Sequence, residues 1–248
     1  MTTTHSYTVQ TISPLQLKLD IKNPRFLATQ PTQENSILYL LTYAKVRDLA
    51  LDIIRIGGLF PGERIVVFKD SNDDYIVLEG NRRVCACQIL LDRSRIPAPQ
   101  AISFPEATDT VRDAIRNLNI DVISSREAAA AFLASRHIGG VERWDTLAKM
   151  KFFEEKFTAG QSIDQISALT NHPAGDIKNH ITQYYLFFEA YSLPCWTQTQ
   201  KDNELNLFKI EVDKFVRIFN TKGAKTSFKL TFDQTTLKSV SALPRNIF

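Results

Sequence analysis

The chain has 248 residues, of which 44% are hydrophobic and 23% are charged, and its formal net charge is +3. These values are typical of a soluble protein with two compact units, and no apolar run approaches the roughly 18 residues that span a bilayer. The first residues, MTTTHSYTVQ, have no basic or apolar segment of a secretory signal, and three cysteines show no metal-ligand spacing. We therefore expect a cytoplasmic protein that does not contact membranes.

The positive charge is unevenly distributed along the chain. Lys and Arg number 12 against 11 Asp and Glu in residues 1–108, 9 against 11 in residues 109–196, and 9 against 5 in residues 197–248. Only the C-terminal part is basic. Because binding to duplex DNA is driven largely by neutralising phosphates, the slightly acidic middle part weighs against DNA binding there.

The first part of the chain is predicted to mix strands and helices. Alternating apolar and polar residues predict a strand at 15–21, and a turn follows at Asn23-Pro24-Arg25-Phe26. Helical spacing runs from 34 to 56, with a phase shift near Lys45 that leaves open two helices or one bent helix. The remaining predicted elements are a hairpin at 64–70 and 75–79, helices at 81–91 and 111–118, a strand at 119–124, and an irregular proline-broken segment at 96–106.

From residue 125 onward the pattern is helical. Helices are predicted at 125–138, 143–157, 162–171, 174–191 and about 203–220, and a weakly strand-like tail at 227–233. The short turn at His172-Pro173 gives the outline of a helix-turn-helix. We expect an α+β protein with a small mixed-sheet domain at 1–124, a helical domain at 125–196 containing the helix-turn-helix (162–191), and a basic extension at 197–248.

The junction of the second hairpin strand with the following helix is the strongest candidate site. A strand that ends at Gly80 and enters a helix directly lets a ligand approach the backbone and exposes N–H groups beside the positive end of the helix dipole. Arg82 and Arg83 lie in the first turn, where cations are unfavourable without an anionic partner and where their forked donors suit phosphate. The alternative is a solvated salt bridge of these arginines with Glu79, Asp92 or another acid.

The seven residues that begin at Gly80, GNRRVCA, resemble the GERRxRA motif of the ParB/sulfiredoxin superfamily, which binds nucleotide phosphates at a strand-to-helix junction. NPR at 23–25 is similar to the family's NPR-type turn, and Gly58-Leu59 with Pro61 is similar to its GLLQPI segment. The resemblance extends from about residue 15 to residue 191. It implies a ParB/sulfiredoxin-like domain followed by an all-helical helix-turn-helix domain, with CTP or ATP as the ligand.

The resemblance also implies a set of site residues. A second phosphate contact of the family corresponds to Arg136 and His137, just before a glycine pair, Gly139-Gly140, that would act as a hinge; the alternative is that Arg136 caps its helix. The nucleotide- or phosphate-binding candidates are thus Glu79, Gly80, Asn81, Arg82, Arg83, Arg25, Gly58, Arg136 and His137.

Two departures from the family motif bear on catalysis. Asn81 stands where the family has a glutamate linked to metal in nucleotide-hydrolysing members, and Cys85 replaces the third arginine. Glu79 carries a carboxylate one residue earlier, but on the strand. We therefore favour phosphate binding over magnesium-dependent hydrolysis, and magnesium remains only an alternative cofactor.

The second helix of the helix-turn-helix would place its N-terminal half in the major groove of double-stranded DNA. Its candidate DNA-binding residues are Lys178, Asn179, His180 and Gln183, since amide side chains pair with adenine and lysine contacts guanine or phosphate. A helix-turn-helix that only packs or docks a partner would have the same outline.

Three functions remain open at this point. In the first, the nucleotide bridges and orients the two domains of a DNA-binding protein, as in ParB clamps. In the second, the same fold is a small NTPase or phosphotransferase. In the third, the chain is an interaction module of a phage-defence or mobile-element assembly with a vestigial nucleotide site. A homodimer or a larger assembly is compatible with each of the three.

Overall fold

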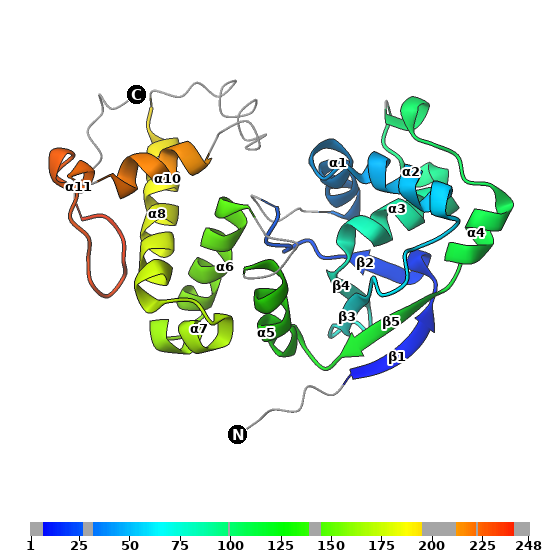
Figure 1. Ribbon diagram of the computed structural model, residues 1–248, viewed down its shortest axis with the longest axis horizontal. Helices are drawn as coiled ribbons and strands as arrows, with labels where there is room; N and C mark the ends of the chain where they lie inside the picture. Colours follow the sequence, from blue (N-terminus) through cyan, green and yellow to red (C-terminus); the bar gives the residue numbers. More distant parts are fainter. Residues whose placement is uncertain are drawn as a thin grey trace. The chain divides into compact units, whose positions relative to one another are not determined.

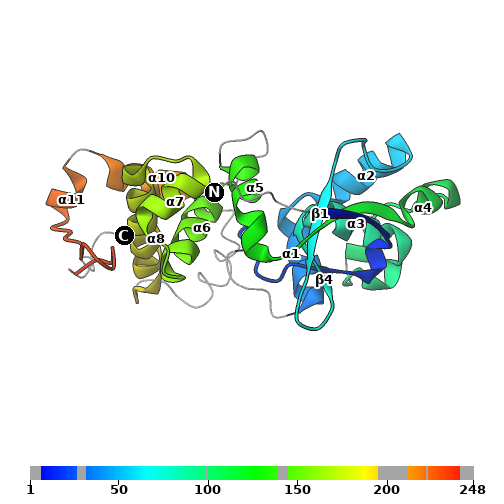
Figure 2. The same cartoon turned by 90° about the horizontal axis from the view of Figure 1, so that it is seen from below.

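The computed structural model describes residues 7–26, 32–98, 100–138, 145–194, 212–221 and 223–240. The protein is α+β, as predicted, and divides into two compact units, Met1–Leu133 and Ala134–Phe248 (Figures 1 and 2). The described strands form one mixed sheet in the first unit, whereas the described part of the second unit is almost entirely helical. Within the described ranges, no helix combines the length and apolarity needed to cross a membrane.

The sheet of the first unit has five strands in the order β1-β5-β3-β4-β2. The strands are β1 (Tyr7–Ile12), β2 (Leu17–Leu19), β3 (Ile65–Lys69), β4 (Tyr75–Glu79) and β5 (Leu118–Ile123). β3 and β4 form the predicted antiparallel hairpin, whereas β5 runs parallel to β3 and β2 runs parallel to β4. β1 pairs antiparallel with β5 along its whole length and was not predicted; most of its side chains are exposed, including those of Tyr7 and Val9.

Helix α3 (Asn81–Leu91) is the central helix of the first unit. Nine of its eleven residues are buried, and it contacts α1 (Gln33–Tyr43), α2 (Val46–Ile56) and α4 (Asp109–Ile115). Figure 1 shows these helices on one side of the sheet. Lys45, in a left-handed conformation with φ 52°, separates α1 from α2, so the phase shift in the sequence marks two helices.

The edge strand β2 is short and is capped by a side chain. The Gln33 amide at the start of α1 donates to the Leu19 carbonyl (2.9 Å) and accepts from the Leu19 N–H (2.7 Å). These are the backbone groups that a further strand would use, so the side chain blocks this edge against pairing. It also fixes the end of β2, from which the loop at residues 20–26 begins.

The second unit is built around a three-helix arrangement. Its described helices are α6 (Thr146–Thr158), α7 (Ile163–Thr170), α8 (Ala174–Ser192), α10 (Val212–Asn220) and α11 (Ala224–Ser227), and α6, α7 and α8 pack against one another. Ser162 forms a capping box with Gln165 at the start of α7, and Asn171, at φ 51°, ends that helix. The predicted turn between two helices is therefore confirmed.

The C-terminal part packs with the helical unit. Phe215 of α10 lies edge-on against Phe187 of α8, with ring centroids 5.3 Å apart. The described part of the predicted helix at 203–220 is α10; residues before 212 lie outside the described ranges. The predicted strand-like tail is not a strand: across its described residues the structure has an isolated bridge between Phe232 and Ser239.

Candidate functional site

The junction between β4 and α3 depends on a glycine. Gly80 has φ 92°, a left-handed conformation that other residues adopt at a cost. A Cβ atom at this position would lie 3.1 Å from Cγ1 of Ile65, so β3 packs directly against the glycine. Close approach to Gly80 is therefore a property of the fold itself, and glycine would be required there without any ligand.

Arg83 is engaged within the fold. Its Nη2 lies 2.9 Å from Oε1 of Glu79, and the side chains of the two residues are only 7% and 6% exposed. Nη1 of Arg83 also donates to the Arg64 carbonyl at 3.4 Å. This ion pair corresponds to the alternative considered for the sequence, except that it is buried instead of solvated. Direct phosphate contact by Arg83 would remove the guanidinium from buried Glu79, at a high energetic cost.

Asn81 ties three segments together. Its Oδ1 accepts from the Asp20 N–H (2.9 Å), and its Nδ2 donates to the Val77 carbonyl (2.8 Å). An amide supplies both an acceptor oxygen and a donor NH2 group, whereas the ionised glutamate of the family motif would supply acceptors only. The structure thus gives a local reason for asparagine here, and it places this side chain inside the fold, with the residue 5% exposed.

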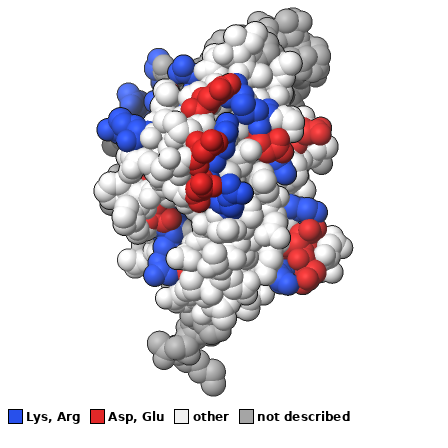
Figure 3. All heavy atoms as spheres, turned by 90° about the vertical axis from the view of Figure 1, so that its right-hand side faces the viewer, with Lys and Arg blue, Asp and Glu red and all other residues white. Residues whose placement is uncertain are grey.

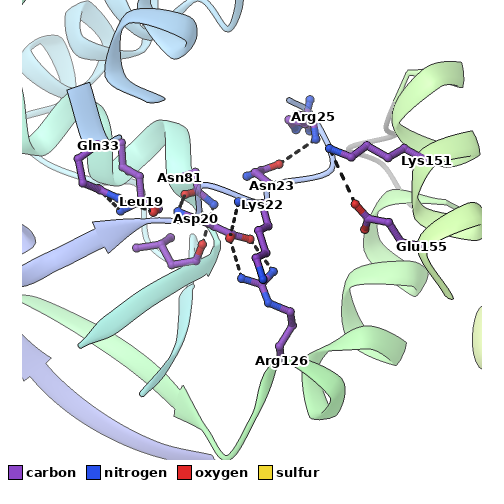
Figure 4. A network of polar contacts seen from close by, with 11 residues as sticks. Leu19, Asp20, Lys22, Asn23, Arg25, Gln33, Asn81, Arg126, Lys151 and Glu155 are labelled. Atoms are coloured by element: carbon purple, nitrogen blue, oxygen red, sulfur yellow. Dashed lines mark hydrogen bonds and ion pairs between the residues drawn. The ribbon is translucent and has the colours of Figure 1, made fainter. Parts of the chain in front are cut away.

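The loop at residues 20–26 is held rigidly beside this junction (Figure 4). The Asn23 side chain accepts from the Arg25 N–H (2.9 Å), and the Tyr39 hydroxyl donates to the Arg25 carbonyl (3.0 Å). The backbone of Arg25 is therefore fixed on both sides. Its guanidinium is half-buried and makes no hydrogen bond or ion pair with any side chain or backbone atom in the described ranges.

A forked ion pair between Asp20 and Arg126 was not predicted. Nη1 and Nη2 of Arg126 lie 2.7 and 2.6 Å from the two carboxylate oxygens of Asp20, and Oδ1 of Asp20 also accepts from the Lys22 N–H. The Asp20 side chain is 2% exposed, and the Arg126 guanidinium stacks over the Phe68 ring at 5.4 Å. A cation at the first position of a predicted helix was the available signal, because it requires an acid nearby.

The segments that these contacts join at the start of α3 are rich in positively charged residues. Arg82, half-exposed, follows Asn81, and the loop beside it carries Lys22 and Arg25. The charged residues that the contacts connect to this junction comprise five cations and two acids: Lys22, Arg25, Arg82, Arg83, Arg126, Asp20 and Glu79. The excess of positive charge favours a multivalent anion.

Three other predicted ligands lie elsewhere. Gly58 follows α2, and the nearest atom to a Cβ placed there is Cβ of Ala114 in α4, at 3.6 Å. Arg136 and His137 end α5 (Arg126–His137), in the part that counts with the second unit, and His137 is buried. The predicted hinge at 139–140 lies outside the described residues.

The cysteines of α3 face the core. Both Cys85 and Cys87 are fully buried, and burial raises the pKa of both thiols, that of Cys87 to about 12. A thiol with a raised pKa stays protonated at neutral pH and is a poor nucleophile. Among the described residues, no group of three His, Cys, Asp or Glu side chains is arranged to hold a metal ion.

The four DNA-binding candidates on α8 separate into two pairs. Lys178 and Asn179 are exposed near the start of the helix. His180 packs its ring against Phe153, and its Nδ1 donates to the Asp176 carbonyl at 2.7 Å. Gln183 is buried and donates to Oδ1 of Asn220 in α10. The fold therefore offers the first pair to a partner and uses the second pair internally.

The face of the first unit in Figure 3 carries mixed charge. Acidic and basic side chains are interspersed there. On α2 and α4, exposed arginines pair with aspartates three residues away, as Arg55 does with Asp52 and Arg116 with Asp113. Such pairing leaves little net field to attract DNA. No protein-family model matches this chain, and no curated protein matches it.

Proposed function

We propose that the first unit is a ParB/sulfiredoxin-like domain that binds the phosphates of CTP or ATP at the start of α3, and that the second unit binds double-stranded DNA. The observation that carries the proposal is the interlocked junction at Gly80. It holds the N–H groups of the first turn of α3, Arg82 and the loop bearing Arg25 in one locally rigid structure around Asn81 and Asp20.

The start of α3 suits an anion. α1, α6 and α7 begin with side-chain caps from Thr32, Asp145 and Ser162. α2 and α8 have no side-chain cap, but each carries an aspartate in its first turn, whereas α3 has neither a cap nor an acid there. A phosphate would accept from these N–H groups and complement the helix dipole.

The predicted ligands take different roles in this proposal. Arg82 and Arg25 are half-exposed and contact the phosphates, while Glu79, Asn81 and Arg83 hold the strand, the helix and the loop in place. Arg83 stays paired with Glu79, since its release would leave a buried carboxylate without its counter-ion.

Binding without hydrolysis is the function that this donor set favours. Asn81 uses both ends of its amide within the fold and offers no carboxylate to a metal ion. The carboxylate of Glu79, which precedes Gly80 in the chain, is buried and paired with Arg83. The residues present therefore fit a nucleotide better than a nucleotide with its magnesium ion, because magnesium prefers carboxylate and water oxygens.

DNA binding by the second unit is proposed on a narrower basis. Lys178 and Asn179 project from the N-terminal half of α8, the part of a recognition helix that meets base edges. In the full proposal, nucleotide bound to the first unit controls this activity, and the nucleotide bridging predicted from the resemblance remains a prediction.

Isothermal titration with CTP, ATP and GTP, each with and without duplex DNA, tests the proposal. We expect saturable binding of at least one nucleotide, weakened at least about tenfold by Arg82→Ala and by Arg25→Ala, since each removes charge-assisted hydrogen bonds to phosphate. Arg55→Ala, which removes an exposed paired arginine of α2, is the matched control and should bind as the wild type does. Equal affinity in all four proteins would exclude this phosphate site.

A further inference from the structure

We propose that Asp20 is a positioning residue that couples the anion site at the start of α3 to the first turn of α5, so that a bound nucleotide holds that turn more firmly. This inference rests on the proposed function, because it names how the same site would be read out. It goes further by assigning a route and a responding element, neither of which the sequence motifs include.

The route consists of two contacts that leave Asp20 in different directions. Its backbone N–H donates to Oδ1 of Asn81, the first residue of α3, and its carboxylate receives the fork of Arg126, the first residue of α5. Figure 4 shows Asp20 between these two partners. One residue of the 20–26 loop therefore joins the starts of two helices that are 45 residues apart in the sequence.

The geometry makes this connection stiff. The Asp20 side chain is 2% exposed, while that of Arg126 is 31% exposed, so the acid is buried behind the guanidinium. A forked pair fixes the orientation of the guanidinium plane as well as its distance from the carboxylate, and the guanidinium also lies over the Phe68 ring. Breaking the pair would leave a buried carboxylate uncompensated. A shift of Asp20 is thus transmitted to Arg126 instead of being absorbed.

The first turn of α5, which is the responding element, is sensitive to a small shift of Asp20. Ser125 caps α5 through the Ala128 N–H at 3.2 Å, and Arg126 places a cation against the positive end of the helix dipole. The Asp20 carboxylate offsets that repulsion. The stability of the first turn of α5 therefore depends on the position of Asp20. Asn81 sets that position, and it lies at the N-terminal end of α3, where phosphate would bind.

The coupling is tested by amide hydrogen exchange of residues 128–133, measured with and without CTP and, separately, ATP. In the wild type we expect the bound nucleotide to slow this exchange by a factor of about ten, within the usual range of coupling between two sites. Asp20→Asn keeps the backbone contact to Asn81 and removes the fork, so the effect of the nucleotide should be lost. Arg126→Lys keeps the charge and should retain part of the effect.

Asp92→Asn is the matched control, because Asp92 also pairs with an arginine but lies at the opposite end of α3. It should leave the slowing by nucleotide unchanged. Full slowing in Asp20→Asn would overturn the coupling role, and so would equal loss in Asp92→Asn.

A measurement without nucleotide separates failure of the coupling from failure of the proposed function. In the unliganded protein, Asn81→Ala and Arg126→Lys should each speed exchange at 128–133. If Asp20 connects them, the double variant should speed exchange by less than the product of the two factors. If the rate factors of the two single variants multiply in the double variant, the connection is overturned, whether or not any nucleotide binds. Non-additivity combined with no nucleotide binding supports the connection and rejects the proposed function.

Discussion

The start of α3 and the start of α8 both carry residues predicted to bind phosphate or DNA, yet the protein uses charge differently in the two places. At α3, charged and amide side chains are buried and interlocked: Glu79 with Arg83, and Asn81 with the backbone of Asp20. At α8, Lys178 and Asn179 are exposed, whereas the next residue, His180, packs its ring against Phe153.

This difference shows that the polar residues of a short sequence motif are not all exposed to solvent, since several of them are engaged within the fold. Buried ion pairs contribute weakly to stability but are costly to break singly, whereas exposed cations change binding and leave stability almost unaffected. The two regions should therefore respond to substitution in opposite ways, and the following variants test that contrast.

The largest effect is expected from Glu79→Ala. It leaves Arg83 buried without its carboxylate, and we expect a loss of about 3–5 kcal/mol in the free energy of unfolding, measured by urea denaturation with circular dichroism. Replacing both partners, as in Glu79→Leu with Arg83→Met, should cost less than the single change. Asp113→Ala, which breaks an exposed pair, should cost at most about 1 kcal/mol. A similar loss for Glu79→Ala and Asp113→Ala would show that the buried pair is not important for the fold.

Glycine substitutions compare the two units at a smaller scale. Gly80 and Gly160 have φ of 92° and 90°, but only Gly80 has a neighbour within 4 Å of the added Cβ, at 3.1 Å. Gly160→Ala should cost about 1–2 kcal/mol of unfolding free energy, the cost of the left-handed conformation. Gly80→Ala should cost more, because Ile65 must also move. Equal losses in thermal or urea unfolding would contradict the close packing at the junction.

The α8 residues should separate binding from stability. Lys178→Ala should weaken duplex DNA binding at all sequences and reduce the slope of log affinity against log salt by about 1. Gln183→Ala should leave that slope unchanged and lower the unfolding free energy by about 1–2 kcal/mol, because it removes a buried hydrogen bond to Asn220. Fluorescence anisotropy over a salt series measures the first, and urea denaturation the second. A reversed pattern would place Gln183 at the DNA.

The smallest effect concerns pH. Burial lowers the pKa of His180 below its ordinary 6.5, and the hydrogen bond to the Asp176 carbonyl only partly opposes this. The unfolded chain then binds a proton that the folded unit resists, so stability is complete above about 6.5 and falls as the pH decreases toward the folded pKa. His180→Gln should reduce this slope between pH 6.5 and 5. If the free energy of unfolding of the wild type increased as the pH falls from 6.5 to 5, the buried environment of His180 would be contradicted.

The sequence predicted the elements well where periodicity was strong. The hairpin and α3 follow from alternation and helical spacing, and the α7–α8 turn follows from His172-Pro173 between two helical patterns. β1 was missed because its place in the sheet depends on pairing with β5, more than a hundred residues away in the sequence.

The sequence indicated the strand-to-helix junction at Gly80, but not which of its polar side chains are buried within the fold. The sequence places Glu79 and Arg83 four residues apart, but it does not show that their side chains turn inward across the junction. It likewise gives no indication that Asp20 meets Arg126, because that contact depends on tertiary packing between segments 106 residues apart. Local patterns identify which groups are present, and burial decides which of them remain for a ligand.

The most direct test of the account follows the backbone amide signals of the protein by nuclear magnetic resonance while CTP, and then ATP, is added. The account predicts that the largest shifts with at least one nucleotide occur at the N–H groups of Asn81, Arg82 and Arg83, with smaller changes at Arg25. Saturating shifts confined to other parts of the protein, or no shift with either nucleotide, would contradict phosphate binding at the start of α3.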